Sequence, residues 1–230
     1  MSEKLLSVEN LTMKFGGLIA IDDLSFSAKK DQITSIIGPN GAGKTTVFNC
    51  LTGFYKATSG SMFLNKDNKT LDLKKFSDFK VAQKAGVART FQNIRLFPQM
   101  SVLENMMVAQ HNKLMVASGF SLLGLINAPS FLKKEKEAKE ISKYWLDIIN
   151  LTNRADDNAG DLPYGDQRKL EIVRAMCIEP HLLCLDEPAA GLNAKESAEL
   201  NKLLKFIQKD KKTGILLIEH DMSVVMGISD

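Results

Sequence analysis

Short apolar runs separated by turn residues occupy the first third of the chain and predict strands. They cover residues 6–8, 24–28, 32–37 and 61–64, and a further run covers 86–90. The Gly16-Gly17 pair and the polar segment 29–31 are turn signals between them.

The middle of the chain changes to a helical pattern that begins at Val102. Residues 133–150 predict a helix in which charged positions precede an apolar end, and the charges at 133–139 are interpreted as a solvated helix face. A further helix is expected from Gly165 to about Ile178, because its apolar residues recur at helical spacing.

Two short apolar runs, at 182–185 and 215–218, are typical of central parallel strands covered on both faces. Together with the preceding elements they predict an α/β core. The helical stretch between Gln92 and Gly165 interrupts this order. We therefore expect a core made of residues 1–91 and 166–230, with residues 92–165 inserted as a helical subdomain.

Composition excludes several classes of protein. The chain has 230 residues, of which 44% are hydrophobic and 25% charged, so overall disorder is excluded. A net charge of +3 does not indicate nucleic acid as a partner. Three cysteines, Cys50, Cys177 and Cys184, lie in apolar contexts, which indicates buried residues in a reducing compartment and neither disulfides nor a metal site. The N-terminal residues lack the form of a signal peptide, so a cytoplasmic location is expected.

One uncharged stretch, at 114–132, approaches the length of a membrane span. A span needs about 20 predominantly apolar residues, and the serines, glycines, asparagine and proline in this stretch make a transmembrane helix unsuitable. The favoured interpretation is an apolar helix and turn packed within the protein. The alternative is a surface that touches a membrane-embedded partner.

Residues 38–46 read GPNGAGKTT, which is a complete phosphate-binding loop of the form G-x-x-x-x-G-K-[ST]. Glycines let the backbone wrap tightly and point N–H groups at phosphate oxygens, Lys44 can reach the β- and γ-phosphates, and the Thr45 hydroxyl can ligate Mg²⁺. A helix is expected at 46–51, and its N-terminal dipole favours the anion. The predicted nucleotide contacts are Gly38, Pro39, Asn40, Gly41, Ala42, Gly43, Lys44, Thr45 and Thr46.

Residues 182–188 read LLCLDEP and place two acids at the end of an apolar strand, which we expect to neighbour the strand that feeds the phosphate loop. Asp186 offers the hard oxygen ligand that Mg²⁺ requires, and Glu187 can accept a proton from an attacking water. The alternative is that both acids only cap the turn before Pro188.

GPNGAGKTT, Gln92, LPYGDQRKL at 162–170, LLCLDEP and His220 closing LLIEH together resemble an ABC-transporter ATPase over nearly the whole chain. Within that family, LPYGDQRKLEIVRAM, LDEPAAGLN, LLIEHDMSVVMGISD and the insertion around 114–129 are most similar to the larger ATPase type of branched-chain amino-acid importers. The resemblance implies a P-loop NTPase (RecA-like) α/β core with an antiparallel β subdomain and an inserted helical subdomain.

The resemblance also implies roles for matched positions. Phe15 stacks on adenine, with an ordinary core residue as the alternative. Gln92 reaches Mg²⁺ and the attacking water, and His220 contacts the γ-phosphate. Thr45, Gln92 and Asp186 are then the expected Mg²⁺ ligands, while Glu187, His220 and Gln92 are the catalytic set. Residues 190–193 resemble a loop that crosses to the dimer partner.

The signature segment, which contacts the partner's ATP in this family, departs from the common Leu-Ser-Gly-Gly-Gln. It comprises Leu162, Pro163, Tyr164, Gly165, Asp166 and Gln167. Proline at the serine position offers neither a hydroxyl nor an N–H. Gly165 and the following helix N-terminus remain as anion-binding elements, and Asp166 is expected to cap that helix. Our hypothesis is that the ATP site completed by this segment is the weaker of the two.

The resemblance implies ATP and Mg²⁺ as cofactors, and as partners a second ABC ATPase subunit, transmembrane permease subunits and, indirectly, a substrate-binding protein. The expected location is the cytoplasmic face of the membrane. Three alternatives remain: an exporter or lipid-extraction ATPase, a soluble ABC-type ATPase acting on nucleic acid or ribosomes, and a non-hydrolysing regulatory subunit. The family normally continues beyond Asp230, so the C-terminal end is interpreted as truncated, by nature or otherwise.

Overall fold

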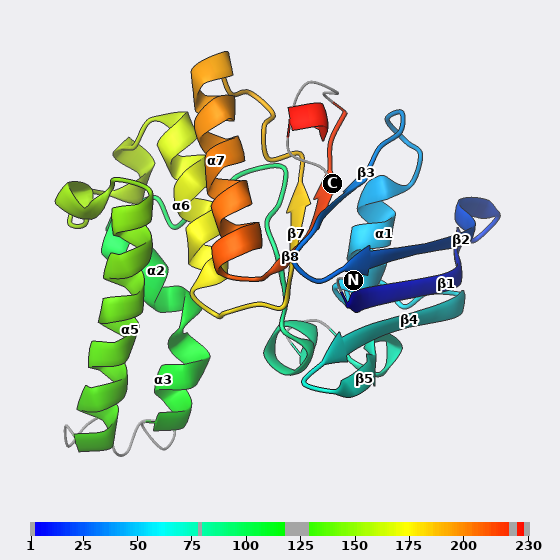
Figure 1. The fold of residues 1–230 in the computed structure, drawn as a ribbon, viewed down its shortest axis with the longest axis horizontal. Coiled ribbons are helices and arrows are strands. Elements are labelled where there is room, and N and C mark those ends of the chain that lie inside the picture. The colour runs from blue at the N-terminus through cyan, green and yellow to red at the C-terminus, as the bar shows by residue number, and fades with distance from the viewer. Residues whose placement is uncertain (1–2, 78–79, 118–128, 221–224, 228–230) are drawn as a thin grey trace. The chain divides into compact units, whose positions relative to one another are not determined.

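A computed structural model describes residues 3–77, 80–117, 129–220 and 225–227 (Figure 1). The chain divides into two compact units, one formed by residues 1–92 and 180–230 and the other by residues 93–179. We call them the strand-rich unit and the helical unit. From the sequence we expected the core to resume at residue 166, whereas the strand-rich unit resumes at residue 180. The difference arises because the helix at 164–176 packs against the helices of the helical unit.

The strand-rich unit contains an antiparallel sheet in the order β2-β1-β4-β5. Its strands are β1 (Lys4–Phe15), β2 (Leu18–Lys29), β4 (Ser59–Lys66) and β5 (Lys69–Asp72). The predicted runs at 6–8, 24–28 and 61–64 lie inside three of these strands, which are longer than expected. Register shifts along the β1–β2 and β1–β4 pairs interrupt the alternation of apolar and polar residues, so the sequence pattern shows only parts of these strands.

A parallel sheet in the same unit has the order β3-β8-β7-β6. It consists of β3 (Ile33–Ile36), β6 (Val87–Arg89), β7 (Leu182–Asp186) and β8 (Gly214–Ile218). Every residue of β7 and β8 is buried, which confirms the prediction of central strands. However, β8 lies between β3 and β7. The expectation that the acid-bearing strand directly neighbours the phosphate-loop strand is therefore wrong.

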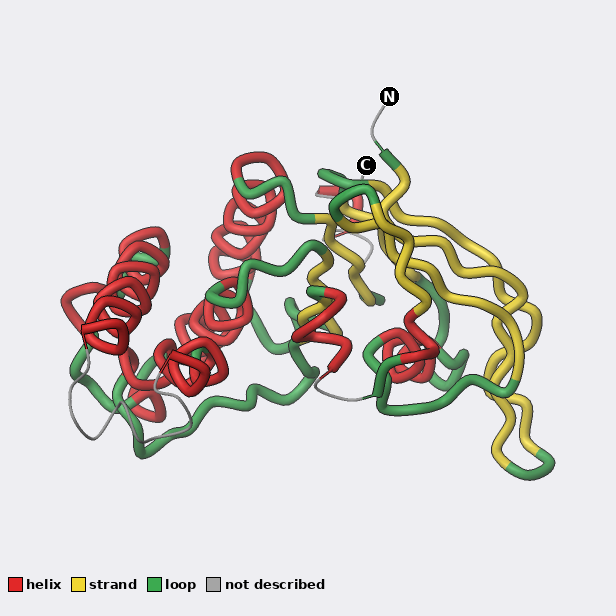
Figure 2. Tube along the Cα trace, turned by 90° about the horizontal axis from the view of Figure 1, so that it is seen from below, coloured by secondary structure: helices red, strands yellow, loops and turns green. Residues whose placement is uncertain are grey.

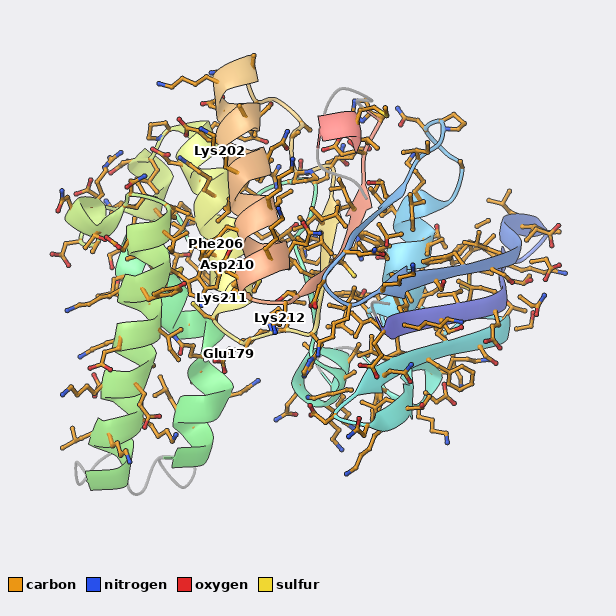
Figure 3. The ribbon with its side chains drawn as sticks, viewed as in Figure 1. Glu179, Lys202, Phe206, Asp210, Lys211 and Lys212 are labelled. Carbon is orange, nitrogen blue, oxygen red and sulfur yellow. The ribbon has the colours of Figure 1, made fainter. Side chains whose placement is uncertain are left out.

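Helices α1 (Lys44–Leu51) and α7 (Ala194–Asp210) belong to the same unit. Helix α7 begins with a capping box between Asn193 and Glu196. Its apolar face is buried through Leu200, Leu203, Leu204 and Ile207. Lys202 and Phe206, one turn apart on this helix (Figure 3), are exposed and half-buried respectively. The helix is thus amphipathic, with one face in the core.

The described regular elements of the helical unit are helices (Figure 2). They include α2 (Val102–Ala109), α3 (His111–Ala117), α5 (Pro129–Ile148) and α6 (Tyr164–Met176). The buried Gln110 amide ties the end of α2 to α5, because it donates to Ala138 O and Ser142 Oγ, each at 3.0 Å. The charges at 133–139 form exposed ion pairs along α5, as expected for a solvated face.

Cys50, Cys177 and Cys184 are buried, as predicted. Within the described ranges, no helix combines the length and the apolar character that a membrane span requires. Residues 118–128 of the uncharged stretch lie outside the described residues, so its packing and its contact with a membrane partner stay predictions.

Candidate functional site

The register of the parallel sheet aligns the ends of three strands. Ile36 of β3 pairs with Ile218 of β8, and Ile218 pairs with Asp186 of β7. The residues that follow these strands are the phosphate loop, Glu219 and His220, and Glu187. The sheet therefore brings the predicted loop, acids and histidine to one edge, where ligands bind in open α/β sheets.

The phosphate loop owes its path to glycine at two positions. Gly41 and Gly43 have φ angles of 82° and 84°, in the left-handed region that glycine favours. A Cβ at Gly43 would also lie 2.2 Å from the carbonyl oxygen of Ala20. Helix α1 begins directly after Gly43, two residues earlier than the sequence predicted, so its first N–H groups face the loop.

Lys44 is buried, and its ammonium donates to the carbonyl oxygens of Gly38 at 2.8 Å and Pro39 at 2.9 Å. The loop thus wraps around its own cation. Thr45 and the loop residues Pro39, Asn40, Gly41 and Ala42 are exposed. This arrangement offers backbone N–H groups and a positive charge to an anion that approaches from solvent.

Glu187 lies at the centre of a polar group. Gln92 donates a hydrogen bond from Nε2 to Glu187 Oε2 at 2.8 Å, and His220 Nδ1 lies 3.7 Å from Glu187 Oε1. Glu187 has a φ of 47°, which is uncommon outside glycine, and its N–H donates to Ile218 O at 2.9 Å. The three predicted catalytic residues therefore meet, with the carboxylate as acceptor.

The turn after Glu187 is held by a residue that the sequence analysis did not assign. Glu219 is buried, and its carboxylate accepts a hydrogen bond from the Ala189 N–H at 3.0 Å. In the sequence analysis, the alternative role for Asp186 and Glu187 was to cap this turn. The carboxylate that accepts a hydrogen bond from the turn is that of Glu219. The side chain of Asp186 instead forms an ion pair with Arg89 at 2.9 Å, with only 6% of the side chain exposed.

Arg89 is a second residue of the site to which the sequence analysis assigned no role. It ends β6, which pairs with β7, and its guanidinium donates to both Asn49 and Asp186. Residues 89 and 186 are far apart in the sequence, and the pairing of β6 with β7 brings Arg89 close to Asp186. The short strand pattern at 86–90 gave no sign of it.

Phe15 is 41% exposed and meets Tyr55 edge-to-face, with ring centroids 5.2 Å apart. The alternative that Phe15 is an ordinary core residue is therefore wrong. Its ring stands at the end of β1, before the turn at Gly16, and offers an aromatic face that a purine can stack on.

The signature segment opens helix α6 in the helical unit. Pro163 is the N-cap residue and no side chain caps the helix. The expectation that Asp166 caps it is wrong, because the helix begins at Tyr164 and Asp166 lies within its first turn, paired with Lys169 at 2.9 Å. Gln167 Nε2 donates to Leu162 O at 2.8 Å and so folds the segment back on itself.

Tyr164 of this segment is 45% exposed, but its hydroxyl contacts a buried side chain. The fully buried Arg168 donates to Tyr164 Oη at 3.2 Å and pairs with Glu171 at 2.9 Å. Burial raises the pKa of Glu171, against the opposing effects of the Arg95 N–H and of Arg168. The sequence analysis assigned no role to Arg168 or Glu171, because their pairing and burial depend on how α6 packs in the helical unit.

The oxygen donors at the sheet edge suit a hard cation. Thr45 carries a hydroxyl, Gln92 an amide oxygen and Asp186 a carboxylate. Within the described residues no group of three or more His, Cys, Asp or Glu side chains forms a cage for a metal ion. A donor set with one carboxylate fits Mg²⁺, which is commonly held by one or two carboxylates together with phosphate oxygens and water.

Comparison with known proteins finds relatives that match the whole of this chain. The branched-chain amino acid transport ATP-binding protein LivG of Escherichia coli is 50% identical over 230 residues, which is 100% of this chain and 87% of that protein. BraF of Pseudomonas aeruginosa, described in the same words, is 49% identical over the same 230 residues and the same share of both chains.

The solved structures that resemble this chain include ATP-binding cassettes of ABC transporters. A nucleotide-free ATP-binding cassette from an ABC transporter superposes with a TM-score of 0.81 at 31% identity, over 99% of this chain and 85% of that chain. An ABC cassette in its ADP conformation matches with the same TM-score, identity and coverage. The predicted fold, an α/β P-loop core with antiparallel and helical parts, is confirmed. The ABC transporter family model matches residues 21–190, and the chain belongs to that family of ATPases.

Proposed function

We propose that this chain is the ATP-hydrolysing subunit of an ABC importer for branched-chain or similar hydrophobic amino acids. The observation that carries the hydrolytic part is the meeting of Gln92, Glu187 and His220 at the edge of the sheet that also holds the phosphate loop. The choice of cargo rests on LivG and BraF, whose names state branched-chain amino acid transport.

ATP is held by the chain's own loop. The backbone N–H groups of residues 38–46 and the Lys44 ammonium bind the phosphates, and Phe15 stacks on the adenine. When Mg²⁺ is bound it neutralises the charge that develops on the phosphoryl oxygens. Thr45, Gln92 and Asp186 are the residues that would hold it.

Glu187 accepts a proton from the attacking water. Its carboxylate is anchored by Gln92, and it is 14% exposed, so it is restrained without being sealed from water. His220, whose side chain is 57% exposed, stabilises the charge that develops on the γ-phosphate. Because the acid and its partners are assembled here, we place the chain among hydrolysing subunits and not regulatory ones.

A second ABC ATPase subunit completes each site. The signature segment, Leu162 to Gln167, contacts the ATP held by that subunit, and residues 190–193 cross to it. Pro163 lacks the hydroxyl and N–H that a serine would offer, so we propose that the site completed by this segment binds ATP more weakly. Loss of one hydrogen bond to a charged group costs about 1.5–3 kcal/mol, which suffices for asymmetry between the two sites.

The remaining partners are permease subunits in the membrane and, through them, a substrate-binding protein, with this chain at the cytoplasmic face. Purification of the tagged chain from native membranes tests this directly. Permeases identified in the purified complex, with uptake of branched-chain amino acids lost when the chain is deleted, are the expected result. Recovery of soluble partners alone would contradict the transporter, and a complex that extrudes its cargo would favour the exporter.

A further inference from the structure

A buried arginine lies behind the proposed Mg²⁺ ligand. Arg89 ends strand β6, and its side chain is only 5% exposed. One end of its guanidinium donates to Asp186 Oδ2 at 2.9 Å, and the other end donates to Asn49 Oδ1 at 2.6 Å. The group therefore bridges β7, which carries the acids, and α1, which follows the phosphate loop.

Two aromatic rings lie close to this guanidinium. Its central carbon lies 4.8 Å from the centroid of the Phe91 ring and 5.5 Å from that of Phe48. Its Nε is buried without a hydrogen-bond partner. Hydrogen bonds at two of its nitrogens and contacts with two rings restrain the side chain, so it has little freedom to turn.

This geometry also fixes the carboxylate of Asp186. Of its two oxygens, Oδ2 accepts the hydrogen bond from Arg89, whereas no described residue donates to Oδ1. A carboxylate held by one oxygen presents the other in a defined direction. Hydrogen bonds of this kind orient the groups that ligate metals, and removal of such an outer partner typically lowers metal affinity 10- to 100-fold.

We propose that Arg89 is a positioning residue for Mg²⁺, which acts by orienting the carboxylate of Asp186. The inference rests on the proposed function, in which Asp186 is a Mg²⁺ ligand. Arg89 touches neither the nucleotide loop nor the three catalytic side chains in the described contacts. Its removal therefore changes the dependence of nucleotide binding on Mg²⁺ and leaves metal-free binding in place.

A purely structural role makes a different prediction. Arg89 also compensates the charge of a buried carboxylate, and loss of one partner of a buried ion pair is destabilising. If this were its whole role, replacing it would lower the unfolding temperature without moving the Mg²⁺ midpoint in the protein that remains folded.

The test uses the full chain and a fluorescent ATP analogue, titrated with Mg²⁺ and separately in EDTA. Arg89→Met keeps an unbranched side chain beside the two rings but removes the charge. We expect it to raise the Mg²⁺ concentration for half-maximal binding about 10-fold, with affinity in EDTA unchanged within about twofold. Arg89→Lys restores the charge without bridging both partners, so its midpoint should lie between those of the wild type and Arg89→Met.

Unfolding temperatures measured on the same samples show whether each variant is folded at the assay temperature. If Arg89→Met does not fold, the shift in Arg89→Lys decides. A wild-type Mg²⁺ midpoint in the folded variants overturns the inference. Asp186→Asn tests the proposed function separately from the inference about Arg89. If Asp186→Asn leaves the Mg²⁺ midpoint unchanged, Asp186 is no Mg²⁺ ligand and that part of the proposed function fails. A shift in Asp186→Asn with none in the Arg89 variants refutes the inference alone.

Discussion

Gln92 and Glu187 are joined by a hydrogen bond of 2.8 Å, although 95 positions separate them in the sequence. Gln92 is the last residue of the strand-rich unit before the chain enters the helical unit. The proposed base is thus anchored by the residue from which the helical unit begins.

Gln92→Ala should lower ATP turnover while ATP binding persists. A hydrogen bond to a charged group contributes about 1.5–3 kcal/mol, so we expect a loss of about 10- to 100-fold in turnover. Steady-state phosphate release by the assembled transporter measures it. Asn93→Ala alters the exposed neighbouring residue and serves as the matched control, with turnover near that of the wild type. Equal turnover in Gln92→Ala and Asn93→Ala would show that the contact has no role in hydrolysis.

Pro163 predicts that the two ATP sites of a heterodimer contribute unequally. Glu187 serves the site built on this chain's own phosphate loop, whereas Pro163 belongs to the other site. Glu187→Gln should therefore lower turnover more than the equivalent replacement in the partner subunit. Pro163→Ser should make the two losses of turnover more nearly equal, because it restores a hydroxyl to the signature segment that completes the partner's ATP site. Equal losses from the two acid replacements would sink the hypothesis of a weaker site.

The buried thiols predict a loss of stability at alkaline pH. Burial raises the pKa of Cys50 to about 11 and that of Cys184 to about 12, from an ordinary value of 9.0. The folded state therefore keeps both protons after the unfolded state has lost them, so this contribution is full below pH 9 and is lost between about pH 9 and 12.

Urea unfolding at several pH values compares the wild type with a Cys50→Ala, Cys184→Ala double variant. The double variant is less stable at every pH, because it leaves cavities, but its stability should fall less steeply above pH 9. Parallel curves for the two proteins would mean that the thiols do not contribute to the pH dependence.

The central strand β8 predicts a large cost for core truncation. Leu216 is fully buried, and Leu216→Ala should lower the free energy of unfolding by about 2–5 kcal/mol. Lys202→Ala, on the exposed face of α7, should change it by less than about 0.5 kcal/mol. Denaturant unfolding of both variants measures the difference. A cost below about 1 kcal/mol for Leu216→Ala would contradict the placement of β8 between two strands.

The sequence predicted the elements that local chemistry specifies. The apolar runs at 182–185 and 215–218 became fully buried strands, and the glycine pattern of residues 38–46 became the loop. Each of these is encoded within a few consecutive residues, where strand burial and glycine backbone freedom leave a direct mark.

The features that the sequence did not reveal depend on contacts between distant segments. The position of β8 between β3 and β7 is a matter of sheet order, and the Arg89–Asp186 pair follows from the pairing of β6 with β7. The cap expected at Asp166 was wrong for a local reason, since α6 starts at Tyr164 with Pro163 as its N-cap residue. An aspartate preference for N-caps does not fix where a helix begins.

The most direct measurement of the central claim is ATP turnover by the assembled transporter carrying Glu187→Gln, together with its affinity for ATP. The amide keeps the size of the side chain but cannot accept the proton from water. We predict that turnover falls by ~10²–10⁴, as expected for a lost general base, while ATP affinity stays within a few-fold of the wild type. Turnover equal to that of the wild type would contradict the assignment of Glu187 and the mechanism built on it.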